Sequence, residues 1–167
     1  KGKFLRECAI NNPHINYFGF EKDVKVAYRC VKNIPEDDPT NYYIVYANAE
    51  SLKEVFEEGS VERIYLNFSD PWPKSSHHKR RLTHKKFLDI YKVVLADNGE
   101  IHMKTDNNDL FEFSIEQFEN DNWEFLMVTR DLHNSIYKEG NITTEYEEKF
   151  IKEGKKINKL IVRKNNG

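Results

Sequence analysis

The 167-residue sequence has little of what secreted or membrane-bound proteins usually contain. It has two cysteines, Cys8 and Cys30, and neither has a Cys-x-x-Cys partner, so two buried thiols are favoured over a disulfide or a metal site. No apolar run approaches the roughly 18 residues of a membrane span, and Lys1-Gly2-Lys3-Phe4 does not resemble a signal peptide. A cytoplasmic protein without a membrane partner is therefore expected.

A large charge excess is also lacking, because 26 Lys and Arg residues face 28 Asp and Glu residues, for a net charge of −2. Taken alone, this balance argues against a nucleic-acid partner. A metal site is not expected either, since His77, His78 and His84 lie among cationic residues that repel a divalent ion. What is present is a globular composition, with 38% hydrophobic and 13% aromatic residues. The length suits one domain, here residues 1–167.

Strand-like and helix-like segments alternate along most of the chain. For example, Val24, Ala27, Tyr28 and Val31 recur at helical spacing. The predicted strands are 16–20, 42–46, 63–68 and 100–104, the predicted helices are 4–10, 23–33, 52–58, 83–95 and 106–118, and two late strands are 123–128 and 159–163. This order predicts an α/β fold, a mostly parallel sheet with helices on both faces.

Ligands of such sheets bind at the carboxyl ends of the strands. The residues expected there are Glu21, Asn48, Asp70 and Asp106. Glu21 has the position of an acid that accepts hydrogen bonds from ribose hydroxyls, although a solvated acid or a helix N-cap is the simpler alternative. The chain starts on a helix, so the usual first strand and its glycine loop are missing apart from Gly2, and an N-terminally incomplete domain is expected.

The most informative stretch is Asp70-Pro71-Trp72-Pro73-Lys74. Two prolines stiffen this loop, and rigid loops at strand ends often carry function, although a structural turn is the alternative. Trp72 either stacks on a ligand or braces the loop.

A concentrated basic run follows that loop. Residues 74–86 contain six Lys and Arg residues and no acid, and without those cations the other 154 residues carry a net charge of −8. Such a patch can bind nucleic acid on an acidic protein, because each cation that neutralises a phosphate releases counterions, although most charge runs are only a solvated face. Further on, Thr144 and Glu147 fit a capped helix, or a pair that reads the donor edge of a base.

These motifs together resemble the bacterial tRNA (guanine-N7-)-methyltransferases. The resemblance covers essentially the whole chain, and its most specific part is the Asp-Pro-Trp-Pro-Lys loop followed by His-Lys-Arg-Arg. The matching segments are Asn16–Glu21, Asn48–Glu50, Leu66–Lys74, His78–Leu82, Lys104–Asp106 and Thr144–Glu147. The resemblance implies a Rossmann-like, class I fold that uses S-adenosyl-L-methionine to methylate N7 of guanosine 46 in the variable loop of tRNA.

Site roles also follow from the resemblance. It implies that Asp70 is catalytic and that Gly2, Glu21, Asn48 and Asp70 bind the cofactor. It implies substrate binding by Lys74, Asp106, Thr144, Glu145, Tyr146 and Glu147, and RNA contact by Ser76, His77, His78, Lys79, Arg80 and Arg81. Only Lys1-Gly2-Lys3-Phe4 remains of the family's Gly-x-Gly-Lys-Gly-x-Phe loop, so this chain as it stands is expected to bind the cofactor poorly.

Two other functions stay open at the level of sequence. One is a methyltransferase for an exocyclic amine, which Trp72 between the prolines disfavours. The other is a non-catalytic RNA-binding partner that kept the basic loop. A monomer or a homodimer is expected.

Overall fold

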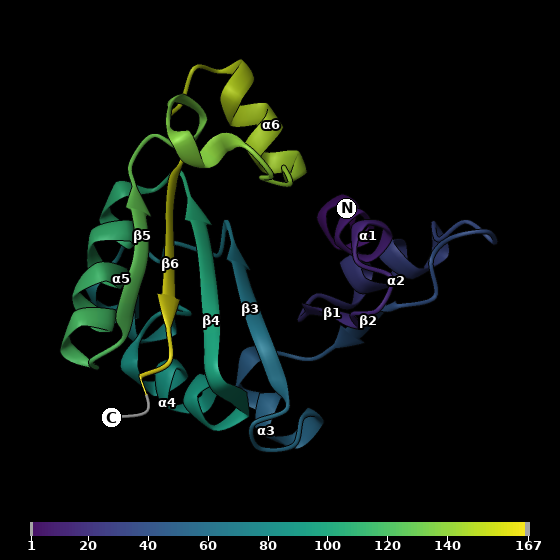
Figure 1. Ribbon diagram of the computed structural model, residues 1–167, viewed down its shortest axis with the longest axis horizontal. Coiled ribbons are helices and arrows are strands. Elements are labelled where there is room, and N and C mark those ends of the chain that lie inside the picture. Colours follow the sequence, from purple (N-terminus) through teal and green to yellow (C-terminus); the bar gives the residue numbers. More distant parts are fainter. Residues whose placement is uncertain (1, 166–167) are drawn as a thin grey trace.

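The computed structural model, which describes residues 2–165, has the alternating α/β order expected from the sequence (Figure 1). The helices are α1 (Lys3–Asn11), α2 (Val24–Lys32), α3 (Leu52–Val55), α4 (Lys85–Val94), α5 (Asn108–Asn120) and α6 (Glu145–Lys152). The strands are β1 (Tyr17–Glu21), β2 (Tyr42–Tyr46), β3 (Val61–Asn67), β4 (Leu95–Thr105), β5 (Glu124–Thr129) and β6 (Asn158–Arg163). Short 3-10 turns are η1 (Ala49–Ser51), η2 (Ser75–Arg80), η3 (Leu132–Asn134) and η4 (Ile136–Lys138).

The strands of the described residues form a two-stranded sheet, β1-β2, and a four-stranded sheet in the order β3-β4-β6-β5. β1 is parallel to β2 and β3 is parallel to β4, whereas β6 is antiparallel to both of its neighbours. Each parallel pair is joined through a helix, α2 or α4, because parallel strands need a long crossover connection; the antiparallel pair β5-β6 is joined through η3, η4 and α6. The predicted α/β fold is confirmed; two of the four pairs between the described strands are parallel, and both antiparallel pairs involve β6.

The main core lies on one face of the four-stranded sheet. Leu88 and Tyr91 of α4 and Phe111 and Phe118 of α5 are buried against it, together with Leu160 of β6. Burying such side chains contributes about 1.5–3 kcal/mol each. This packing makes the carboxyl ends of β3 and β4 a firm base for the loops that follow them.

Helix α2 is present where the sequence places it, but its apolar residues do not form a buried face. Ala27 is buried, whereas Val24, Tyr28 and Val31 are 57%, 64% and 54% exposed. The helix packs on the small β1-β2 sheet, so the helical spacing of its apolar residues predicted the helix but not the side of it that is buried. Cys30 on this helix is half-buried, which corrects the expectation of two buried thiols; Cys8 is buried, and burial raises its pKa to about 11.

The predicted helix 52–58 is shorter than expected. Residue Phe56 is already extended, with φ −116° and ψ 141°, and α3 ends at Val55. Among residues 2–165, no helix has both the length and the apolar character to cross a membrane. The same residues contain no group of three or more His, Cys, Asp or Glu side chains arranged to hold a metal ion.

Candidate functional site

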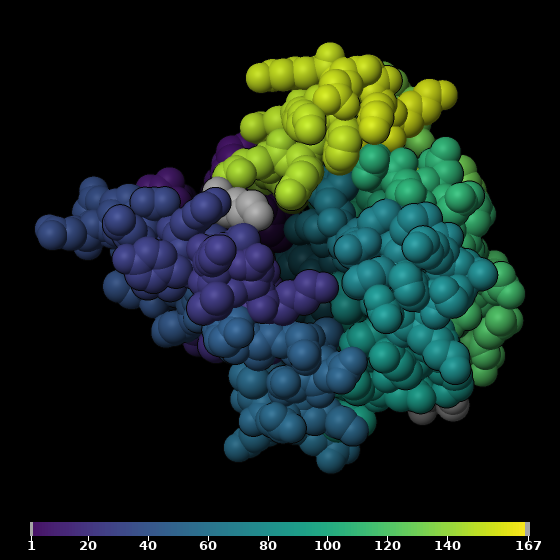
Figure 2. Space-filling view, turned by 180° about the vertical axis from the view of Figure 1, so that it is seen from behind, coloured from purple at the N-terminus to yellow at the C-terminus, as the bar shows by residue number. Residues whose placement is uncertain are grey.

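The polar residues predicted at the strand ends lie around one rim of the molecule. Parallel pairing puts Glu21 of β1 beside the end of β2, where Asn48 follows, and it puts the ends of β3 and β4 side by side. The two sheets meet at these ends, because Lys22 Nζ lies 5.5 Å from the ring centre of Trp72. Figure 2 shows a hollow between the purple and blue N-terminal part and the teal and green part that contains β3 to α5.

On the N-terminal side of the rim, the groups suit an adenosine moiety. Glu21 Oε1 accepts a hydrogen bond from the Asp23 amide at 2.9 Å, and its other oxygen makes none within residues 2–165. Asn48 caps η1 by accepting from the Glu50 amide at 3.0 Å. Gly2 precedes α1 with φ 94°, in the left-handed region that favours glycine, and an added Cβ would meet no atom within 4 Å. A free carboxylate oxygen, a side-chain amide and an open glycine turn fit the expected cofactor.

The Asp70 loop turns sharply where it leaves β3. Phe68 and Trp72 have φ values of 53° and 43°, and a bulky residue in this region costs about 1 kcal/mol or more. Asp70 is exposed, and its Oδ1 accepts a hydrogen bond from the Trp72 amide at 3.1 Å. This turn fixes the position of the Asp70 carboxylate just beyond the end of β3.

Trp72 braces this loop. The Arg80 guanidinium lies 5.0 Å from its ring centre, Lys22 approaches at 5.5 Å, and the His77 ring packs edge-on at 5.8 Å. Cation–π contacts of this kind contribute about 0.5–1 kcal/mol each at exposed sites. Of the two roles left open for Trp72, the geometry favours the brace.

The basic segment after the loop is not uniform. Lys74, Ser76, Lys79 and Arg80 are exposed, as expected for residues that contact RNA. Arg81 differs, because it is only 3% exposed. Its Nε donates to the Pro71 carbonyl at 2.7 Å, and its guanidinium lies 4.7 Å from the Phe113 ring centre. The expectation that Arg81 contacts RNA is therefore corrected: its buried side chain binds the Pro71 carbonyl and stabilises the Asp70 loop.

The two histidines of this segment are half-buried. His77 contacts Trp72, and the His78 ring lies 5.7 Å from the ring of Phe113. On the neighbouring strand end, Asp106 is half-buried, with its Oδ2 at 3.7 Å from Lys155 Nζ. Asp106 and Asp70 thus come from adjacent strands, whereas Lys74 extends outward on the exposed side.

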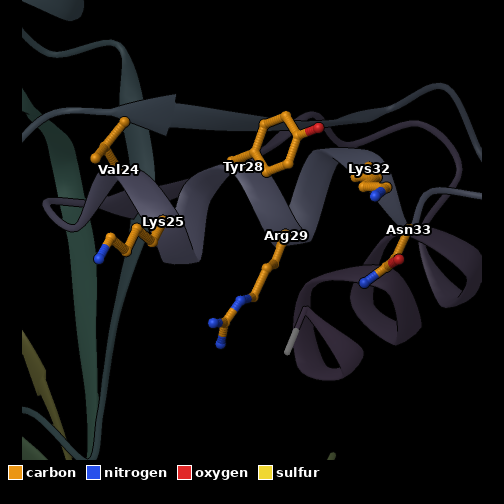
Figure 3. Close-up of a pocket in the computed structure, with 6 residues that line it drawn as sticks. All are labelled: Val24, Lys25, Tyr28, Arg29, Lys32 and Asn33. Atoms are coloured by element: carbon orange, nitrogen blue, oxygen red, sulfur yellow. The ribbon is translucent and has the colours of Figure 1, made fainter.

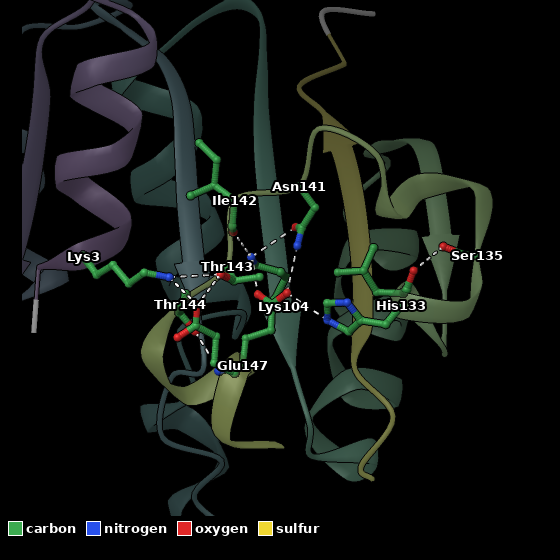
Figure 4. A network of polar contacts seen from close by, with 11 residues as sticks. Lys3, Lys104, His133, Ser135, Asn141, Ile142, Thr143, Thr144 and Glu147 are labelled. Atoms are coloured by element: carbon green, nitrogen blue, oxygen red, sulfur yellow. Dashed lines mark hydrogen bonds and ion pairs between the residues drawn. The ribbon is translucent and has the colours of Figure 1, made fainter. Parts of the chain in front are cut away.

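A buried polar network anchors the 138–148 segment to β4 (Figure 4). Lys104 Nζ donates to Glu147 Oε1 at 2.6 Å and to the Ile142 carbonyl at 2.8 Å. Glu147 Oε2 accepts from Asn141 Nδ2 at 2.8 Å, and the Glu147 amide donates to Thr144 Oγ1 at 3.0 Å. Burial lowers the pKa of Lys104, although its bond to Glu147 opposes this.

This network corrects the expected roles of Thr144 and Glu147. The Glu147 side chain is fully buried with both oxygens engaged, and the Thr144 hydroxyl caps α6, so neither faces a substrate base. His133 Nε2 also lies 2.9 Å from Glu147 Oε2, but it is not aligned for a hydrogen bond. Glu145 and Tyr146, which lie between Thr144 and Glu147 at the start of α6, are exposed.

Two further contacts complete the rim. Tyr146 lies beside Phe68, with ring centres 6.3 Å apart, and this aromatic surface borders the Asp70 loop. Lys3, next to Gly2, donates to Thr143 Oγ1 at 3.2 Å and pairs with Glu148 (Figure 4). No role was predicted for Lys3, Phe68 or Lys104; the one signal in the sequence was a lysine at the end of the strand predicted at 100–104.

Comparisons with known proteins agree with this arrangement. Residues 1–160 match the model of a family described as "Putative methyltransferase". The chain is 53% identical over 163 residues to the tRNA (guanine-N(7)-)-methyltransferase of Alkaliphilus oremlandii (strain OhILAs), which covers 98% of this chain and 77% of the relative. It is 48% identical to the protein of the same name from Lachnoclostridium phytofermentans, over 96% of this chain and 75% of the relative.

Solved structures support the fold alone. An antibiotic-related methyltransferase superposes with a TM-score of 0.68 at 18% identity, covering 98% of this chain and 82% of that one. The 16S rRNA methyltransferase KamB superposes with a TM-score of 0.65 at 12% identity, covering 97% and 82%. These neighbours establish a class I, Rossmann-like methyltransferase fold.

Proposed function

The chain belongs to the tRNA (guanine-N(7)-)-methyltransferase family, and we propose that it methylates N7 of guanosine 46 in the variable loop of tRNA. The observation that carries the proposal is the position of the stiff Asp70 loop. It lies between the rim residues Glu21 and Asn48, which suit a cofactor, and the exposed basic segment that follows it. As such an enzyme, the protein would act in the cytoplasm, and a monomer or homodimer remains the expectation.

The cofactor is S-adenosyl-L-methionine, and Glu21, Asn48 and Gly2 are the residues proposed to hold it. The free oxygen of Glu21 suits the ribose hydroxyls, Asn48 lies where the adenine is expected, and Gly2 leaves room at the start of α1. When bound, the cofactor supplies an electrophilic methyl group on a sulfonium.

The chemistry of guanine sets what the protein must do. N7 has a lone pair and no proton, so bond formation from N7 to the methyl carbon needs no base. A bound cofactor would give up its methyl group from the sulfonium, so the positive charge would pass to the purine. The protein therefore has to align the base and stabilise this cation.

Asp70 is proposed to supply that stabilisation. It is an exposed carboxylate held by the Trp72 amide, and Asp106 lies at the end of the adjacent strand. Negative charge near a developing cation lowers the energy of the transition state without proton transfer. Because the guanine lies inside a folded tRNA, it has to be extruded to reach this point; Tyr146 beside Phe68 offers it an aromatic surface.

A single-atom change in the substrate tests the site of methylation. A tRNA with 7-deazaguanosine at position 46 lacks the acceptor nitrogen, so methyl transfer should be lost while tRNA binding is kept. The matched control is the same tRNA with guanosine restored. Transfer to the deaza substrate at the control rate would contradict methylation at N7 of this nucleotide.

A further inference from the structure

We propose that the exposed side of α2 is a second tRNA-binding surface, which binds phosphates outside the methylated nucleotide. The inference rests on the proposed function and concerns four cations, Lys22, Lys25, Arg29 and Lys32, here called the α2 stripe. Lys22 precedes the helix, and the other three lie on it.

The spacing puts the helical members on one side. Successive residues of a helix are about 100° apart, so Lys25, Arg29 and Lys32 fall within about 60° of one another and span about 10 Å along the axis. Figure 3 shows Lys25 and Arg29 extending from the same side of α2, away from Val24 and Tyr28. These side chains border a shallow depression of about 610 Å³ along the helix.

The stripe is exposed and its charges are not neutralised. Within residues 2–165, none of its cations forms an ion pair with a carboxylate, and only Asp23 interrupts its positive charges in sequence. Some cations elsewhere on the surface are paired, as in Arg130–Glu112 at 2.8 Å and Lys92–Asp121 at 2.8 Å. A cationic surface whose charges are not paired with carboxylates is suited to an external polyanion.

The stripe joins the basic segment of residues 74–86 through one indole ring. Lys22 Nζ and the Arg80 guanidinium lie 5.5 and 5.0 Å from the ring centre of Trp72, so cations from both sides converge there. In Figure 2 the purple and blue part that contains α2 faces the teal part that contains η2 across the hollow. A single RNA whose target base enters the hollow therefore meets positive charge on both flanks.

The chemistry of recognition is that of a phosphate backbone. Lysine and arginine bind phosphates without regard to base identity, so the stripe would position the tRNA and leave the choice of guanosine to the hollow. Tyr28, 64% exposed beside the stripe, adds an aromatic face. The stripe should act mainly on tRNA affinity, with little effect on the methyl-transfer step.

Salt titration of tRNA binding tests the surface. In the full chain, Lys25→Gln/Arg29→Gln should raise the Kd for tRNA about fivefold to tenfold and flatten the slope of log Kd against log salt by about 1.5. The matched control, Lys53→Gln/Lys92→Gln, removes two cations from α3 and α4 near the opposite end of the sheet and should keep the slope (Figure 1). Melting curves establish that both variants are folded.

The kinetic readout separates this proposal from the function it rests on. The stripe variant should raise KM for tRNA with kcat within about twofold of the parent enzyme, because the stripe lies outside the reacting groups. Equal slopes of log Kd against log salt for the stripe variant and its control would overturn the proposal that the α2 stripe binds tRNA. A stripe-dependent slope without formation of 7-methylguanosine would instead overturn the function and leave the surface in place.

Discussion

Lys104 and Glu147 form an ion pair inside the protein, with Nζ 2.6 Å from Oε1 and side chains that are 4% and 0% exposed. One residue comes from β4 and the other from α6, so the pair ties a helix and its preceding loop to the sheet. Glu147 therefore holds α6 and its preceding loop in place, and its neighbours Glu145 and Tyr146 are the exposed residues of this turn.

Breaking this pair should destabilise the fold. Lys104→Met leaves a buried carboxylate without its cation, and we expect a loss of about 3 kcal/mol in the free energy of unfolding, measured by urea denaturation. Lys104→Met/Glu147→Leu should recover most of that loss. Glu112→Gln, which opens the exposed pair with Arg130, should change stability by less than about 1 kcal/mol. Strictly additive effects of the two core substitutions would contradict the coupling.

Acid should weaken the fold through His102. Burial, the largest cause, and the nearby cations Arg63 and Lys159 together lower the pKa of His102 from 6.5 to about 4, despite the hydrogen bond to Glu100. Between these pH values the unfolded chain binds a proton that the folded chain does not, so stability falls as pH decreases from 6.5 to 4, by up to about 3 kcal/mol.

Unfolding measured across this pH window tests that assignment. His102→Gln should flatten the dependence, whereas His14→Gln, at an exposed position, should leave it unchanged. If both variants kept the parent's slope, the acid sensitivity would come from other groups.

Arg80 and Arg81 are adjacent in sequence but should give different defects. Arg80→Ala removes an exposed cation, so we expect weaker tRNA binding and a salt slope flatter by about 0.8. Arg81→Ala removes the hydrogen bond to Pro71 and the contact with Phe113, so the loop should loosen and kcat should fall with little change in the salt slope. The reverse pattern would contradict the placement of Arg81.

Asp70→Asn keeps the size of the side chain and its bond from the Trp72 amide but removes the negative charge. We expect kcat to fall about 10- to 100-fold with the Kd for tRNA unchanged, since a carboxylate near the developing cation acts in the transition state. Asp109→Asn, an exposed acid in the first turn of α5, is the control. Full turnover by Asp70→Asn would remove Asp70 from the mechanism.

The features of the fold and the site that could be predicted from the sequence are those that depend on residues close together in the chain. Strand–helix alternation predicted the α/β fold, and the position of Asp70 after a strand predicted its place on the rim, because both follow from short-range periodicity. The buried state of Arg81 and Glu147 could not be predicted, since their partners Phe113 and Lys104 are 32 and 43 residues away in the chain. The α2 stripe was obscured because its cations alternate with apolar residues that mark the helix.

The most direct test of the central claim is methyl transfer from labelled S-adenosyl-L-methionine to unmodified tRNA by the full chain, followed by digestion to nucleosides. The account predicts that the label is recovered as 7-methylguanosine, and that a tRNA with adenosine in place of guanosine 46 takes up none. Label recovered in any other nucleoside, with none in 7-methylguanosine, would contradict it.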